Sequence, residues 1–476
     1  MAWTLGGQWV GYGVQVISTA ILARLVSPHD FGLVGEALTV TALAAQLQSL
    51  GLSQAVIQRA KLTHGQMSNL FWVNVATGGV LMLLVLGAAP LVAAFYGDPP
   101  LVAVIASMSV TFFITGFAVQ HSALMSRRMQ FRSIALRNLT PRVIAAASAI
   151  AVAAAFHAGY WALVLQQLVS AICVLAFVWT AIEWRPGKPQ RRTGVRPLLR
   201  FGAGVSVANI FFYFSSNADN IMVGRFLGTA DLGLYARAYN LFLLPLRQIH
   251  APLGNVVQPV MSAVVNDPPR YRQFYRRTLS AITLVGMPGV VGLAVLSEPF
   301  IEVVLGHRWL GAAQPFRWLA VAGFLQMAAR TFSWLYTTSG RAKAMATWAM
   351  VTSPLLVLAF AIGVHWGITG VAEAYAISQA VLIGPGIWWA VRGTAVTIED
   401  VLAAVWRPIV VAAVCGGVVF GMRELLNSTA PAVILFGSSG VGFACWLAMV
   451  ALWPHLRGDL QSLTGRFTKR SAAAEQ

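Results

Sequence analysis

Two matched stretches of the chain decide its fold: ARLVSPHDFGL at residues 23–33 and GRFLGTADLGL at residues 224–234. A shift of 201 positions aligns them without a gap. The identical pairs are Arg24 with Arg225, Asp30 with Asp231, Gly32 with Gly233, and Leu33 with Leu234. A repeat at a fixed offset indicates a duplicated structural unit. Each copy spans the end of one apolar segment and the start of the next, so the repeat predicts two equivalent helical hairpins.

Polar residues precede each stretch at helical spacing, inside otherwise apolar sequence. The first stripe is Gln8, Tyr12, Gln15 and Thr19, and the second is Asn209, Tyr213, Ser216 and Asn220. Positions i, i+4, i+7 and i+11 share one face of a helix. Burying a polar group without a partner costs on the order of 2 kcal/mol or more, so both stripes are predicted to face protein or water. Beyond the turn, the offset also pairs Thr39 with Asn240.

The composition of the whole chain indicates a membrane protein. Of 476 residues, 58% are hydrophobic and only 10% are charged, which excludes an ordinary soluble domain. A membrane-spanning helix needs about 20 mostly apolar residues. Fourteen such runs are present, at 3–26, 32–57, 69–94, 101–120, 139–156, 160–182, 203–227, 232–257, 278–297, 313–336, 347–364, 367–391, 407–424 and 431–453.

The predicted fold is therefore an all-α polytopic membrane protein with about 14 transmembrane helices. Spans one and seven run in the same direction, so the repeat is parallel and relates two six-helix bundles, followed by two C-terminal helices. The predicted organisation is an N-terminal lobe (1–185), a basic cytoplasmic linker (186–202), a C-terminal lobe (203–395), two extra helices (396–456) and a cytoplasmic tail (457–476).

The net charge of +18 is interpreted as a topology signal. With the N-terminus in the cytoplasm, alternate connections hold 25 of the 33 basic residues, which predicts both termini inside. Nucleic acid is not expected as a partner, whereas the bilayer is. The segment YRQFYRR at 271–277 interleaves aromatic residues with Arg and is interpreted as an interfacial segment on the cytoplasmic face.

Ionisable residues within the spans by default mark a pathway. The predicted cationic cavity is lined by Arg247, Arg330, Arg237, Arg225 and Arg24. Because a guanidinium can donate two parallel hydrogen bonds to phosphate, a lipid phosphate or pyrophosphate is the expected ligand. A purely structural alternative stays open for Arg24 with Asp30 and for Arg225 with Asp231, which would pack the hairpin turns. For Arg247 and Arg330, the alternative is an ion pair with Asp219 or Glu373.

Two carboxyl groups within the spans, Asp219 and Glu373, are candidates for ion coupling, and Glu36 is a weaker one. The alternative for the first pair is a fixed ion pair that orients an Arg. Nucleotide-binding, zinc-protease and serine-hydrolase motifs are absent from the sequence, and its three cysteines are widely spaced. The chain is therefore expected to be no enzyme and to hold no cofactor or metal.

The stretch NADNIMVGRFLGTADLGLY at 217–235, followed by Ala238-Tyr239-Asn240 and Leu244-Pro245, resembles bacterial polysaccharide exporters of the Wzx type. These belong to the multidrug, oligosaccharidyl-lipid and polysaccharide flippase superfamily, and the likeness is greatest to the colanic-acid and lipopolysaccharide exporter branch. The resemblance implies alternating-access movement of an undecaprenyl-pyrophosphate-linked oligosaccharide across the bacterial inner membrane. It also implies coupling to an ion gradient, with a polysaccharide polymerase and chain-length machinery as partners.

Two other functions stay open on the sequence alone. A drug/cation antiporter would share the architecture, although its cavity should be acidic rather than rich in Arg. A membrane-embedded glycosyltransferase or polymerase usually needs a sizeable outer loop with catalytic residues. The largest outer connection here, at 298–312, offers only Glu298, Glu302, His307 and Arg308.

Overall fold

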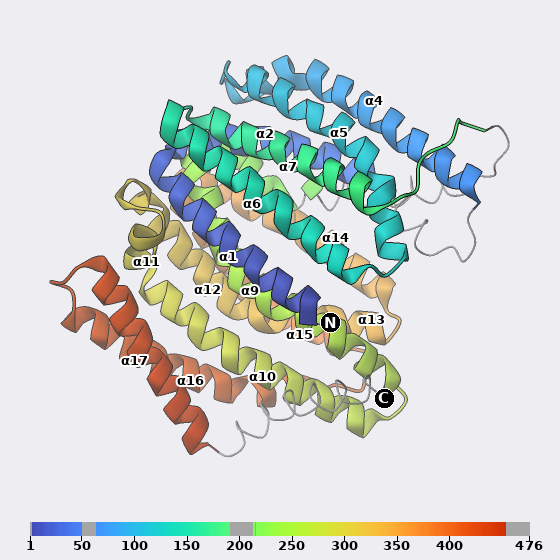
Figure 1. Ribbon diagram of the computed structural model, residues 1–476. Helices are drawn as coiled ribbons and strands as arrows, with labels where there is room; N and C mark the ends of the chain where they lie inside the picture. Colours follow the sequence, from blue (N-terminus) through green and yellow to red (C-terminus); the bar gives the residue numbers. More distant parts are fainter. Residues whose placement is uncertain (1, 50–62, 191–212, 215, 454–476) are drawn as a thin grey trace. The chain divides into compact units, whose positions relative to one another are not determined.

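The computed structural model describes residues 2–49, 63–190, 213–214 and 216–453 (Figure 1). Within these ranges every regular element is a helix, as predicted. The chain packs into two compact units, Met1–Ala236 and Arg237–Gln476, whose boundary falls inside the long helix α9 (Thr229–Ala263). The predicted division into lobes, linker and extra helices stays a prediction, since linker residues 191–202 lie outside the described ranges.

The first unit consists of long helices packed along one another. They are α1 (Ala2–Leu25), α2 (Pro28–Ser49), α4 (His64–Tyr96), α5 (Leu101–Arg127), α6 (Phe131–Phe156) and α7 (Tyr160–Ala181), with helical residues 216–227 and the first turns of α9. Helix α4 packs against α5, and α6 packs against α7 (Figure 1). A capping box of Thr63 and Gln66 starts α4, and Gly97 ends it at a φ of 81°.

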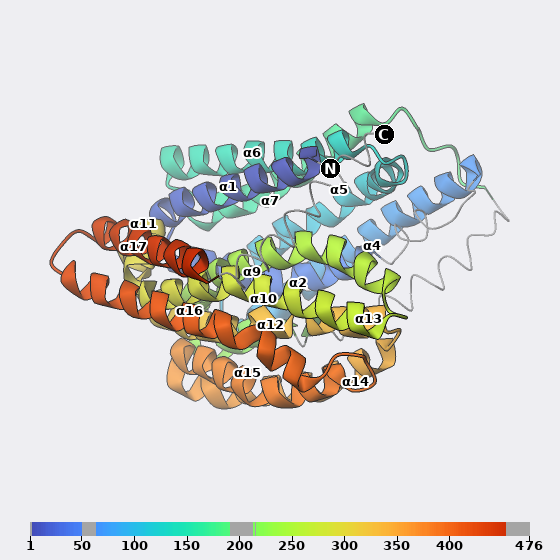
Figure 2. The same ribbon diagram turned by 90° about the horizontal axis from the view of Figure 1, so that it is seen from below.

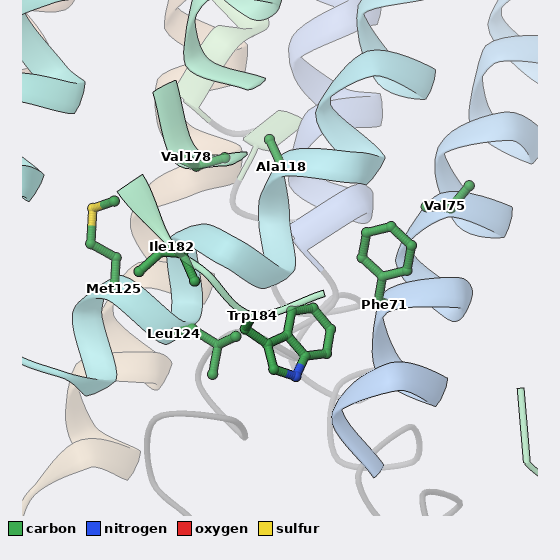
Figure 3. Packing of buried hydrophobic residues seen from close by; sticks show 8 residues of the cluster. All are labelled: Phe71, Val75, Ala118, Leu124, Met125, Val178, Ile182 and Trp184. Atoms are coloured by element: carbon green, nitrogen blue, oxygen red, sulfur yellow. The ribbon is translucent and has the colours of Figure 1, made fainter. Parts of the chain in front are cut away.

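Small residues set the distance between α4 and α5. A Cβ added to Gly78 would collide with the carbonyl oxygen of Phe112, and one added to Gly116 would lie 3.0 Å from that of Asn74. Backbones that approach this closely favour glycine, as in other packed membrane helices. At one end of this pair, a cluster on α4, α5, α7 and the segment directly after α7 buries eight residues (Figure 3): Phe71, Val75, Ala118, Leu124, Met125, Val178, Ile182 and Trp184.

The two copies of the repeat meet within the first unit, where the start of α2 crosses the start of α9. A Cβ on Gly32 would collide with the carbonyl oxygen of Thr229, and a Cβ on Gly233 would collide with that of Pro28. At the offset of 201, Thr229 is the counterpart of Pro28, so the contact is reciprocal. This crossing explains why both copies carry glycine at this position.

The second unit continues α9 and adds a succession of helices (Figure 2). They are α10 (Pro268–Val295), α11 (Ser297–Val304), η1 (His307–Ala312), α12 (Ala313–Ala329), α13 (Phe332–Thr338), α14 (Ala342–Gly363), η2 (Val364–Trp366), α15 (Gly367–Val391), α16 (Ile398–Leu425) and α17 (Pro431–Leu452). Helix α10 packs on α16 and α12, and α14 packs on α15.

The apolar run predicted at 313–336 is interrupted at Arg330 and Thr331, between α12 and α13. The Thr331 amide donates to the carbonyl of Ala328, three residues back, at 3.0 Å, and its hydroxyl donates to the same carbonyl at 2.7 Å. A threonine that bonds back to its own helix competes with the regular ladder and bends the helix. The break therefore places Arg330 at a helix end within the unit.

The sequence predicts that the 271–277 segment is interfacial, but its tyrosines do not lie at the surface of the structure. This segment lies in the first turns of α10, and both of its tyrosines are buried. The Tyr271 hydroxyl bonds the Thr338 hydroxyl at 2.7 Å, and the Tyr275 hydroxyl bonds that of Thr331 at 2.9 Å. Residues four apart share one helical face, and here that face is turned inward.

The Arg residues of the same segment join α10 to the start of α16. Arg272 donates to both carboxylate oxygens of Asp400, at 2.8 and 3.1 Å, and Arg276 lies 3.6 Å from one of them. Asp400 is 3% exposed and also accepts the amide of Thr397 in a capping box. One carboxylate thus caps a helix and ties it to a neighbouring helix.

Replacing Asp400 with Ala should lower the free energy of unfolding by roughly 1–3 kcal/mol, through loss of the cap and of charged hydrogen bonds to half-exposed Arg side chains. Thermal denaturation in detergent measures the change. Replacing Glu302, whose partner His307 is mostly exposed, serves as the surface control and should change stability by less than about 1 kcal/mol. Equal effects of the two substitutions would contradict a structural role for Asp400.

Eight helical stretches in the described residues are long and apolar enough to cross a membrane. The described part of each predicted apolar run is helical, apart from its ends and the break at Arg330 and Thr331. The chain is therefore a multi-pass helical membrane protein, and the total of fourteen crossings stays a prediction.

Candidate functional site

Asp219 is a buried carboxylate of the first unit, 2% exposed, on the helix at 216–227. It accepts the Tyr235 hydroxyl at 3.0 Å, the Asn220 amide at 2.8 Å and the Asn220 side chain at 3.3 Å. Among the described residues, no Arg or Lys forms an ion pair with it. Among the described residues, neutral hydrogen-bond donors therefore hold this carboxylate. The ion pair with an arginine, which the sequence left open as an alternative, is not formed there.

The predicted polar stripes are only partly turned toward the interior of the first unit. Tyr213 is buried and donates its hydroxyl to the carbonyl oxygen of Thr39 on α2. Tyr12, Thr19 and Asn220 are half-buried, whereas Gln15 and Ser216 are exposed. Asn209 and the side chain of Gln8 lie outside the described residues.

The arginines of the repeat hairpins lie at helix ends. Arg24 is exposed in the last turn of α1. Arg225 is exposed, with its guanidinium 5.5 Å from the ring centre of Phe95. Asp30 accepts the hydroxyl of Ser27 at 2.6 Å, and its own backbone amide donates to that hydroxyl oxygen at 3.1 Å, which caps α2. In the first repeat copy, Asp30 is therefore part of the cap of α2.

Arg330 belongs to a hydrogen-bonded chain in the second unit. Its Nη2 donates to Gln326 Oε1 at 3.0 Å, and the amide of Gln326 donates to the hydroxyl of Tyr375 on α15. Gln326 is 6% exposed, and the ring of Tyr375 packs against those of Tyr239 and Phe360, at 6.4 and 5.8 Å between centres. The chain of bonds orients a half-buried guanidinium within an aromatic setting.

The guanidinium of Arg330 has a donor that is available for a further hydrogen bond. Its Nε is buried and has no hydrogen-bond partner among the described residues. Both ring nitrogens of His250 on α9 are in the same situation, and this ring lies 6.3 Å from that of Trp334. A buried donor without a hydrogen-bond partner costs free energy, so such a group is commonly satisfied by a bound ligand. An incoming anion would satisfy the free donor of Arg330.

The other predicted residues of the second unit are more scattered. Arg247 and Asn240 are exposed on α9, and Arg237 is half-buried. Glu373 is half-buried on α15 and forms no ion pair with a described residue. The ion pair between Arg330 and Glu373, an alternative that the sequence left open, is therefore not formed in the described part of the chain.

Gln326, Tyr375 and His250 were not singled out from the sequence. The residues equivalent to Gln326 and Tyr375 at the offset of 201 are Met125 and Val174, so comparison of the two repeat copies could not reveal them. The available signal was local, namely the spacing of Gln326 and Arg330 four residues apart within an apolar run. The polar chain is a property of the second copy alone.

Comparisons with known proteins agree with this architecture. A family model described as polysaccharide biosynthesis protein matches residues 21–314. The lipopolysaccharide biosynthesis protein WzxC of Escherichia coli (strain K12) is 29% identical over 316 residues, which cover 66% of this chain and 64% of that protein. The teichuronic acid biosynthesis protein TuaB of Bacillus subtilis (strain 168) is 26% identical over 453 residues, covering 94% of each.

Among solved structures, the inward closed conformation of the lipid II flippase MurJ superposes with a TM-score of 0.76. The superposition covers 95% of this chain and 98% of MurJ at 15% sequence identity. At this identity the likeness establishes a shared fold.

Proposed function

Because the chain belongs to the polysaccharide biosynthesis protein family, we propose that it is a flippase for a polyprenyl-pyrophosphate-linked oligosaccharide. The substrate is a repeat unit of O-antigen, capsule or exopolysaccharide, moved by alternating access from the cytoplasmic to the outer leaflet of the bacterial inner membrane. An ion gradient drives the cycle, and both termini lie in the cytoplasm. A polymerase and chain-length machinery receive the product. The names of the two relatives and the fold of MurJ support this assignment.

The observation that carries the proposal is the oriented guanidinium of Arg330. Gln326 fixes one edge, and the buried Nε is left for a ligand. Pyrophosphate offers oxygen acceptors at a spacing that a guanidinium matches with two parallel bonds. Arg247, Arg237, Arg225 and Arg24 are proposed to bind anionic groups of the substrate, and Asp219 and Glu373 are proposed to take part in ion coupling. The polar stripes are proposed to contact sugar or water.

A drug/cation antiporter on the same fold is disfavoured by the same group. An organic cation approaching Arg330 would meet like charge, and Gln326 and Tyr375 add no negative charge nearby. The chain is accordingly assigned as a transporter and not as an enzyme.

Deletion of the gene in the producing cell tests the assignment. Surface polysaccharide should be lost, while the lipid-linked oligosaccharide accumulates in the inner membrane and stays inaccessible to a probe added outside spheroplasts. The wild-type gene should restore export. Accumulation of fully accessible lipid-linked oligosaccharide in the deletion strain would show that another protein performs the translocation.

A further inference from the structure

Glu36 on α2 is a buried acidic group that the proposed anion site does not use. Its side chain is 0% exposed, and neither carboxylate oxygen has a hydrogen-bond partner among the described residues. It lies one helical turn beyond Gly32, the residue that touches the start of α9. A fully buried carboxyl without a donor is the least favourable setting for an ionised side chain.

The hydroxyl protons nearest to Glu36 are already engaged. The Thr229 hydroxyl lies beside the carboxyl but donates to Asp98 Oδ2 at 2.8 Å. The Thr39 hydroxyl donates to the backbone carbonyl of Glu36 at 2.6 Å, so in its 3.1 Å contact with Tyr96 the tyrosine is the donor. Each hydroxyl has a single proton. None is left for an ionised Glu36.

The charged groups on the neighbouring elements do not neutralise Glu36 either. Asp98, in the turn after α4, adds negative charge. Arg225, on the helix at 216–227, is exposed and stacks on Phe95. Asp231 in the first turn of α9 is a further acid. The described residues thus place a second carboxylate, and no cation, against Glu36.

We propose that Glu36 holds a proton in this conformation and that Glu36, Thr229 and Asp98 form a proton-binding site. The Glu36 hydroxyl donates to Thr229 Oγ, which donates in turn to Asp98. Separation of α2 from α9 at the crossing admits water, to which Glu36 releases its proton, and rebinding accompanies closure. The link to transport rests on the proposed flippase function, whereas the protonated state does not.

Infrared titration of the purified protein in lipid nanodiscs tests the protonated state without any substrate. At pH 7, wild-type protein should show a protonated-carboxyl band that is absent from Glu36→Gln and retained in Asp30→Asn, the helix-cap control. Gln has the shape of the protonated acid, so this variant should fold. Identical spectra of wild type and Glu36→Gln would overturn the proposal. Loss of the band on adding NaCl at constant pH would overturn the proton as the bound cation.

Translocation in liposomes tests the coupling separately. A pH gradient should accelerate wild-type protein, while Glu36→Gln should keep gradient-independent translocation and lose the acceleration. Acceleration that persists in Glu36→Gln would overturn the coupling role. Absence of translocation by wild-type protein would instead overturn the proposed function, and the infrared result would still decide the protonated state of Glu36.

Discussion

Replacing Arg330 with Ala is expected to slow translocation of a pyrophosphate-linked oligosaccharide by roughly 100- to 1,000-fold, the cost of losing two charge-assisted hydrogen bonds. Gln326 already orients the guanidinium, so little ordering is required when the anion arrives. Translocation rates in liposomes, normalised to the amount of inserted protein, measure the effect. Thermal denaturation should show that the variant is folded.

Three further substitutions separate charge, orientation and non-specific attraction. Arg330→Lys retains the charge but loses the paired donors, so it should restore only part of the rate. Gln326→Leu removes the orienting bond and should cost about tenfold, the equivalent of one hydrogen bond. Arg308→Ala, an exposed residue of η1, should have no effect. Equal losses in Arg308→Ala and Arg330→Ala would show that net charge alone matters.

The second large effect is expected at the crossing of the two repeat copies. Gly32→Ala and Gly233→Ala should each destabilise the protein by roughly 1–3 kcal/mol, because the added Cβ collides with a backbone carbonyl that cannot rotate away. In an open helix the same change would stabilise by up to about 1 kcal/mol. Thermal denaturation therefore reports the sign of the effect directly.

Gly87 provides the matched control for the crossing. It lies in α4 of the same unit, and an added Cβ there has no atom within 4 Å. Gly87→Ala should leave stability unchanged or raise it. If Gly32→Ala and Gly233→Ala behave like Gly87→Ala, the reciprocal contact does not hold the hairpins together.

The sequence predicted the helical membrane fold and the duplicated hairpins because periodicity and repeats are local properties of the chain. It could not predict that the two copies touch, since a fixed offset shows equivalence and not contact. The break before α13 was also missed, because the run at 313–336 is mostly apolar, with Arg317 and Arg330 as its only charged residues. That break depends on Thr331 bonding to Ala328 and to Tyr275.

Candidate site residues were predicted less completely than the fold. Depth within an apolar run identified Arg330 and Asp219, but their partners depend on packing between helices. Tyr375 reaches Gln326 from 49 positions away, and Tyr235 reaches Asp219 from the next helix. Tyr213 belongs to a predicted stripe, but its hydroxyl forms a hydrogen bond with the carbonyl of Thr39 on α2. Periodicity shows which residues share one face of a helix, but it does not show which helix packs against that face.

Reconstitution into liposomes tests the central claim most directly. A fluorescent polyprenyl-pyrophosphate oligosaccharide is incorporated in both leaflets, and a membrane-impermeant quencher then reports which molecules reach the outer leaflet. Wild-type protein is expected to make the inner-leaflet fraction accessible, whereas Arg330→Ala is expected to leave it protected. A protected inner-leaflet fraction with wild-type protein, together with gradient-driven efflux of an organic cation, would contradict the assignment as a flippase.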